Sequence, residues 1–102
     1  KPQLYHADPS GTYVLYDAHA IGNGHEGAQT ILRENYSKTM NLEEAEALVM
    51  RVLKETMQDK VTSSNVEVSS VTAGDGYKMY DSERLQALVE AVHRAPGIID
   101  DA

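Results

Sequence analysis

Asp17 and His19 are the residues of this chain whose types and spacing could most directly do chemistry, within the stretch YVLYDAHAIGNG. In an extended strand, residues two apart share one face, so their side chains would point the same way. A carboxylate beside an imidazole can ligate a metal ion or act as an acid/base pair. A metal site needs more ligands, for which His25 and Glu26 are candidates, but the glycines before them leave their position open. The alternative, which we favour, is a polar pair at a sheet rim or a subunit contact.

A second motif, Asp8-Pro9-Ser10-Gly11, predicts a type I turn, because aspartate, proline and glycine occupy the first, second and fourth positions that favour them. The Ser10 hydroxyl is expected to bond backbone groups of the turn. A nucleophilic serine of the G-x-S-x-G kind would instead need glycines on both sides between a strand and a helix. We therefore interpret these four residues as structural.

The remaining candidates are weaker. The segment GNGHEG precedes a predicted helix, but it has neither the lysine nor the glycine spacing of a phosphate-binding loop. His6 and His93 have no obvious partner in the sequence, and His93 suits a helix C-terminus because of the helix dipole. The sequence thus predicts no catalytic residue, metal ligand or cofactor site beyond the weak candidates Asp17, His19 and His25.

The elements that must position these residues follow the predicted order ββααββα, with mainly antiparallel pairing because hairpin signals dominate. Alternating, β-branched or aromatic segments and apolar stripes of helical period define them. The expected strands are 3–7, 12–22, 65–71 and 77–80; the expected helices are 25–36, 42–57 and one capped by Asp81 or Ser82 and ended by Pro96-Gly97.

The second helix is the clearest of the three. Asn41 followed by Glu44 resembles a capping box. The apolar stripe expected to face the core comprises Leu42, Ala45, Leu48, Val49, Val52, Leu53 and Met57. The face expected to be solvated comprises Glu43, Glu44, Glu46, Lys54 and Glu55.

Composition narrows the class of protein. The chain has 102 residues, which is enough for one small domain. Its net charge of −7 argues against binding nucleic acid or an anionic membrane surface, both of which need clustered basic residues. It contains no cysteine, so disulfides and thiolate chemistry are excluded. No apolar run approaches the ~20 residues of a membrane span, and no signal-peptide stretch begins the chain.

Several segments together resemble one family, the alpha-type subunits of the 20S proteasome. In that family a strand ends in an aspartate-proline-serine-glycine turn, and the next strand closes on alanine-isoleucine-glycine, here Ala20-Ile21-Gly22. The long helix is followed by an asparagine-led strand, here Asn65 to Val68, and the stretch HEGAQ is similar to one typical of the type-5 alpha subunits. The similarity runs from about residue 4 to 92. It implies that residues 1–102 are the C-terminal half of such a subunit, a single partial domain whose N-terminal half is absent.

The resemblance implies a fold and a role. The fold is half of the four-layer αββα sandwich of N-terminal-nucleophile hydrolases. The role is that of a non-catalytic subunit in the outer ring of the core particle, in the cytoplasm and nucleus, acting in assembly, gating and regulator docking during ubiquitin-dependent degradation. Its partners would be other alpha subunits, beta-ring subunits and regulatory particles. The segments that gate the pore and bind activators belong to the missing half. The isolated half is expected to self-associate through open sheet edges.

Two other functions stay open at this point. The first is a metal-dependent or acid/base enzyme that uses Asp17, His19 and His25. The second is a free-standing module that accepts a peptide strand at an open sheet edge.

Overall fold

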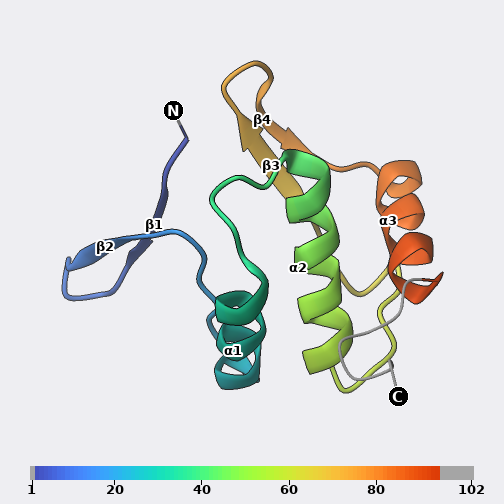
Figure 1. The fold of residues 1–102 in the computed structure, drawn as a ribbon, viewed down its shortest axis with the longest axis horizontal. Coiled ribbons are helices and arrows are strands. Elements are labelled where there is room, and N and C mark those ends of the chain that lie inside the picture. Colours follow the sequence, from blue (N-terminus) through green and yellow to red (C-terminus); the bar gives the residue numbers. More distant parts are fainter. Residues whose placement is uncertain (1, 95–102) are drawn as a thin grey trace.

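The computed structural model describes residues 2–94, and its elements follow the predicted order (Figure 1). Two antiparallel hairpins alternate with helices instead of forming one sheet. In chain order the elements are β1 (Leu4–Ala7), β2 (Tyr13–Tyr16), α1 (His25–Asn35), α2 (Leu42–Thr56), β3 (Ser69–Thr72), β4 (Gly76–Met79) and α3 (Ser82–Arg94). The predicted helix stop at Pro96-Gly97 lies outside the described residues.

Two strands are shorter than the sequence predicts. The strand expected over 12–22 ends at Tyr16, where its pairing with Leu4 ends, because beyond that point no neighbouring strand takes up its backbone groups. The strand expected over 65–71 begins only at Ser69. The Asn65 side chain builds a turn instead: its amide donates to the Lys60 carbonyl at 2.9 Å and its oxygen accepts from the Thr62 N–H at 2.9 Å.

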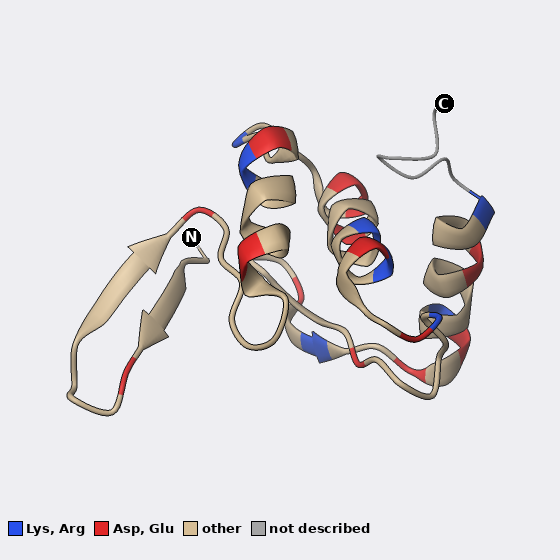
Figure 2. Ribbon diagram, turned by 90° about the horizontal axis from the view of Figure 1, so that it is seen from below, with Lys and Arg blue, Asp and Glu red and all other residues tan. Residues whose placement is uncertain are grey.

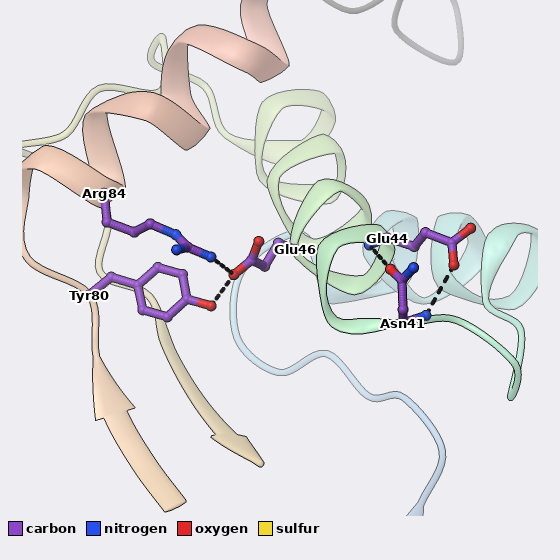
Figure 3. Close-up of polar contacts among 5 residues, drawn as sticks. All are labelled: Asn41, Glu44, Glu46, Tyr80 and Arg84. Atoms are coloured by element: carbon purple, nitrogen blue, oxygen red, sulfur yellow. Dashed lines mark hydrogen bonds and ion pairs between the residues drawn. The ribbon is translucent and has the colours of Figure 1, made fainter. Parts of the chain in front are cut away.

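Local side chains cap the starts of α2 and α3. At α2 the Asn41 oxygen accepts from the Glu44 N–H at 2.8 Å, and the Glu44 carboxylate accepts from the Asn41 N–H at 3.0 Å. This confirms the predicted capping box, which Figure 3 shows. At α3 the Asp81 carboxylate accepts from the Arg84 N–H at 2.9 Å, so Asp81 is the cap. Each contact satisfies a backbone donor that the first helical turn leaves unpaired.

The helices lie side by side with α2 in the middle, and the core forms two clusters on either side of it (Figure 1). The buried residues between α2, α3 and the connecting segment are Met50, Val61, Val66, Leu85, Val89 and Val92. Those between α1 and α2 are Ala28, Leu48 and Val52. None of the helices within residues 2–94 is long and apolar enough to cross a membrane.

This arrangement corrects the predicted stripe of α2. Val49 and Leu42, expected in the core, are 45% and 42% exposed, whereas Met50, absent from the stripe, is 1% exposed. Glu46, expected on the solvated face, is buried. A helix that packs against two neighbours buries residues on two of its sides. A single apolar stripe therefore predicts only part of its buried surface.

Candidate functional site

The turn between β1 and β2 is closed by Asp8. The Gly11 N–H donates to the Asp8 carbonyl at 3.0 Å, and Gly11 has a φ of +92°, a region that glycine enters without steric cost. One Asp8 carboxylate oxygen accepts from the Ser10 hydroxyl, the Ser10 N–H and the Thr12 N–H. The Ser10 hydroxyl bond above all lowers the pKa of Asp8. Pro9 lies at the second position, so all four residues of the motif lie in one hydrogen-bonded turn.

The structure does not bring Asp17, His19 and His25 together as one site. Asp17 follows the end of β2 and lies 3.8 Å from the Lys38 ammonium, with both side chains largely exposed. His25 begins α1, where its Nδ1 bonds the Gly22 carbonyl at 2.8 Å. The expectation that Asp17 and His19 share a strand face is wrong, because the strand has already ended. Among residues 2–94 no group of three or more His, Cys, Asp or Glu could hold a metal ion.

His19 instead joins a ring cluster that the sequence did not indicate. Its ring stacks on Tyr16, with centroids 4.0 Å apart and planes inclined by 13°. The His6 ring, for which no partner was predicted, lies 5.0 Å from His19. The side-chain amide nitrogen of Gln29 on α1 donates to His19 Nδ1 at 2.9 Å. This cluster therefore connects the first hairpin to helix α1.

A second polar cluster centres on buried Glu46 of α2 (Figure 3). Its carboxylate accepts hydrogen bonds from the Tyr80 hydroxyl and from the Arg84 guanidinium, the latter at 2.8 Å. Arg84 also lies over the Tyr80 ring, 5.0 Å from its centroid. Burial, and then the bond to Glu46, raises the pKa of Tyr80. The bond to Glu46 raises the pKa of Arg84 as well.

Sequence reasoning missed this cluster because its members are far apart in the chain. Glu46 and Arg84 are separated by 38 residues. The one local signal is the position of Tyr80 and Arg84 next to the Asp81 cap at the start of α3. Both side chains contact Glu46, near the start of α2. Because the buried Glu46 carboxylate accepts from two donors, its hydrogen-bonding needs are met within the protein. Glu46 therefore has a structural role and connects α3 and the residue after β4 to α2.

The most extensive candidate surface is apolar. One face of the first hairpin carries Tyr5, Tyr13 and Leu15, which are 50%, 69% and 52% exposed, with the two tyrosine rings in edge contact at 5.8 Å. We call this the first hairpin face. Figure 2 shows that β1 and β2 carry no charged residue and extend away from the helices.

The second hairpin repeats the pattern. Val71, Tyr77 and Met79 lie on one face of it and are 56%, 66% and 52% exposed. We call this the second hairpin face. An open groove of about 980 Å³ adds apolar surface between α1, α2 and the segment after β2, where Ala20, Ile21 and Leu48 contribute to its lining. Exposed apolar side chains thus gather on both hairpin faces and line this groove, an arrangement that suits binding to other protein surface.

Comparisons with known proteins agree on one family. Residues 1–71 match the family model described as "Proteasome subunit". The chain is 48% identical over 84 residues to the "Probable proteasome subunit alpha type-5" of Schizosaccharomyces pombe. This alignment covers 82% of this chain and 34% of that protein. It is 44% identical over 90 residues to the "Proteasome subunit alpha type-5" of Trypanosoma brucei brucei, an alignment that covers 87% of this chain and 37% of the relative. The protein of that name from Dictyostelium discoideum is 42% identical over 92 residues, covering 89% and 38%. The chain thus spans about a third of the length of these curated relatives.

Proposed function

This chain belongs to the proteasome subunit family, and on that premise we propose that it forms part of a type-5 alpha subunit in the outer ring of the 20S core particle. The observation that carries the proposal is 42–48% identity over more than four-fifths of the chain to proteins named as that subunit. The proposed role is structural: the subunit supports ring assembly and the docking of regulators, while other subunits hydrolyse the peptides.

Residues 1–102 are proposed to be a partial domain, the C-terminal portion of an αββα sandwich. Because the relatives are nearly three times as long as the matched region, most of such a subunit lies outside this chain. The fold is consistent with this proposal. A two-stranded hairpin is marginally stable alone in water, and both hairpins here lack a third strand.

The first and second hairpin faces are proposed to be covered in the complete assembly, by the rest of the subunit or by its neighbours. The first face gathers two tyrosines and a leucine, and the second a tyrosine, a valine and a methionine, the composition of a buried layer. Covering three half-exposed side chains on each face would contribute several kcal/mol, at about 25 cal/mol per Å² of apolar surface. Proposed neighbours are other alpha subunits and the beta ring, in the cytoplasm and nucleus.

Asp17, His19 and His25 are proposed to be structural or interface residues. Asp17 is paired with Lys38, and His25 bonds the Gly22 carbonyl before α1, so both have structural partners. The contacts therefore favour the subunit role over an acid/base enzyme built on these three residues.

The test uses the complete protein that contains this sequence, expressed with an affinity tag in its source cells. Tyr13→Ser with Leu15→Ser removes most of the first hairpin face, and Glu43→Gln on the exposed side of α2 is the matched control. We expect the unchanged protein and the control to co-purify in a large particle with other alpha and beta subunits. The double variant should enter that particle several-fold less. Absence of the unchanged protein from any such particle would overturn the proposal.

A second function is favoured by one observation, the open edges of both hairpins. Edge strands present unpaired backbone groups that can accept an added strand. A free-standing strand-binding module would be a monomer that binds a defined extended peptide outside any large particle. Particle size in the same experiment therefore separates this function from the subunit role.

A further inference from the structure

We propose that Asn23 is a site of spontaneous covalent modification, at which the side-chain amide is converted to aspartate or isoaspartate through a cyclic imide. Asn23 and Gly24 follow one another in the segment between β2 and α1, and both are exposed. No other asparagine of the chain is followed by glycine. This inference does not depend on the proposed subunit role.

The reaction needs only the chain itself and water. The backbone nitrogen of Gly24 attacks the side-chain carbonyl carbon of Asn23 and closes a succinimide ring. The bond from that carbon to Nδ2 breaks, and ammonia leaves with the proton that the Gly24 nitrogen gives up. Water then adds to one of the two imide carbonyls and opens the ring. Opening at the side-chain carbonyl leaves aspartate, and opening at the main-chain carbonyl leaves isoaspartate, whose backbone runs through the former side chain.

The local backbone leaves the attacking nitrogen accessible. The His25 N–H donates to the Gly22 carbonyl at 3.1 Å, which closes a turn around Asn23 and Gly24. Gly24 has a φ of 78° and a ψ of 7°, the values for the third residue of a type II turn. Within the part of the chain that the structure describes, the Gly24 N–H donates no hydrogen bond. Glycine also has no Cβ that would shield this nitrogen.

The Asn23 side chain is free to reach that nitrogen, unlike the other three asparagine side chains. Those of Asn35, Asn41 and Asn65 bond backbone groups at 2.8–2.9 Å, and a larger residue follows each of them. Among residues 2–94, no hydrogen bond or ion pair holds the Asn23 side chain. The structure therefore distinguishes one asparagine from the others by its bonding as well as by its neighbour.

The modification would change both the start of α1 and the groove beside it. The Gly24 carbonyl accepts from the Ala28 N–H at 3.0 Å as the first bond of α1. Asn23 and Gly24 also belong to the lining of the groove between α1 and α2. Aspartate would add a negative charge to this lining. Isoaspartate would also lengthen the main chain by one methylene within the turn, and should disturb the bond between His25 and Gly22.

The test follows the folded 102-residue chain during incubation in neutral buffer at physiological temperature. Lysine or arginine lies between successive asparagines, so trypsin releases each of the four on its own peptide. We expect the Asn23 peptide to gain about one dalton at least about tenfold faster than the other three. A sample digested at the start corrects for change during digestion. Isoaspartyl methyltransferase with labelled S-adenosylmethionine should then label this peptide, which identifies isoaspartate.

The same measurement in urea tests the structural part of the proposal. Because the turn is exposed and unbonded at the reacting atoms, the folded chain should modify Asn23 within about fivefold of the rate in urea. A much slower rate in the folded chain would overturn the proposal, because the fold would then protect this residue. So would a mass gain that is no faster on the Asn23 peptide than on the others.

Two variants assign the site. Asn23→Gln should lose the mass gain of that peptide, because the longer side chain would have to close a larger, less favourable ring. Asn35→Gln is the matched control and should keep it, since the Asn35 side chain bonds the Ile31 carbonyl elsewhere in α1. Equal gains in the two variants would overturn the assignment. Circular dichroism of each variant establishes that the fold is intact.

Discussion

The carboxylate of Glu46 on α2 lies 2.8 Å from the guanidinium of Arg84 on α3. The glutamate side chain is 7% exposed and the arginine side chain 53% exposed, so a buried carboxylate is neutralised by a cation that keeps contact with water. Tyr80 donates to the same carboxylate oxygen and fixes the end of β4 beside it. One acidic side chain therefore links α3 and the end of the second hairpin to α2, beside the apolar core that α2 and α3 share.

Replacing Glu46 by leucine should destabilise the chain by about 1–3 kcal/mol, because the Tyr80 hydroxyl and the Arg84 guanidinium lose their acceptor. Urea unfolding followed by circular dichroism measures the change. Glu43→Gln, on the exposed side of the same helix, should change the free energy of unfolding by less than about 0.5 kcal/mol. Equal stabilities of the two variants would show that the buried cluster does not hold the helices together.

The Tyr80 phenol should ionise at a higher pH than an ordinary tyrosine, because burial and the bond to Glu46 raise its pKa above 10.0. The folded state then holds this proton more tightly than the unfolded state. Its stabilising contribution is thus present below pH 10 and is lost as the pH rises through the raised pKa. Ring-proton resonances, assigned with Tyr80→Phe, follow the ionisation. Glu46→Gln should lower the Tyr80 pKa, and an unchanged pKa would contradict the assigned cause.

Asp8 should titrate below its ordinary pKa, because the Ser10 hydroxyl and backbone N–H groups bond its charged form. A carboxyl whose pKa is lowered in the folded state stabilises that state above the unfolded value, about 4, and the effect is lost as the pH falls through the lowered pKa. Ser10→Ala should move the Asp8 pKa towards the ordinary value in a carboxyl-carbon resonance titration. Ser64→Ala, in another turn, should not move it.

The α2 capping box should contribute measurably to stability. Asn41→Ala removes the side-chain acceptor for the Glu44 N–H, and the expected loss is about 1 kcal/mol in the free energy of unfolding. Asn41→Asp keeps an acceptor at the cap and should retain most of the stability. Denaturant unfolding of both variants checks this. A fully stable alanine variant would show that tertiary packing alone fixes the start of α2.

Met50 and Val49 are the residues at which the observed core differs from the predicted one: Met50 is buried but was not predicted to be, and Val49 is exposed but was predicted to be buried. Met50→Ala should cost about 2–5 kcal/mol, because it removes a side chain that is 1% exposed and leaves a cavity. Val49→Ala should cost less than about 1 kcal/mol, since Val49 is 45% exposed. Thermal unfolding of the two variants compares them. The reverse order of stabilities would favour the single stripe that the sequence predicts.

These variants also show which parts of the fold are readable from the sequence. The Asn41 capping box, the turn at Asp8 and the cap at Asp81 all depend on side chains that bond backbone groups within four residues, so local pattern predicts them. Element order follows from the same signals together with hydrophobic period. In this chain these three locally coded features agree with the structure, whereas the local strand signals over 12–22 and 65–71 overestimate the strand lengths.

The sequence did not predict the features that depend on contacts between segments far apart in the chain. Burial of Met50 and Glu46 depends on α2 lying between two helices, and the acceptor role of Glu46 depends on a residue 38 positions away. His6 and His19 meet because β2 ends at Tyr16, where the strand pairing stops. A strand continuing to residue 22 would have placed Asp17 beside His19 instead. The candidate site changed because strand length is decided by the available pairing.

The most direct test of the central claim is the native mass of the particle that contains this sequence, purified from its source, with peptide mapping of the subunits. We predict that peptides of this chain occur in one subunit of a large assembly that also contains other alpha and beta proteasome subunits. The subunit should be about three times as long as the region matched here, as its relatives are. A free protein of low mass, absent from every large particle, would contradict the account.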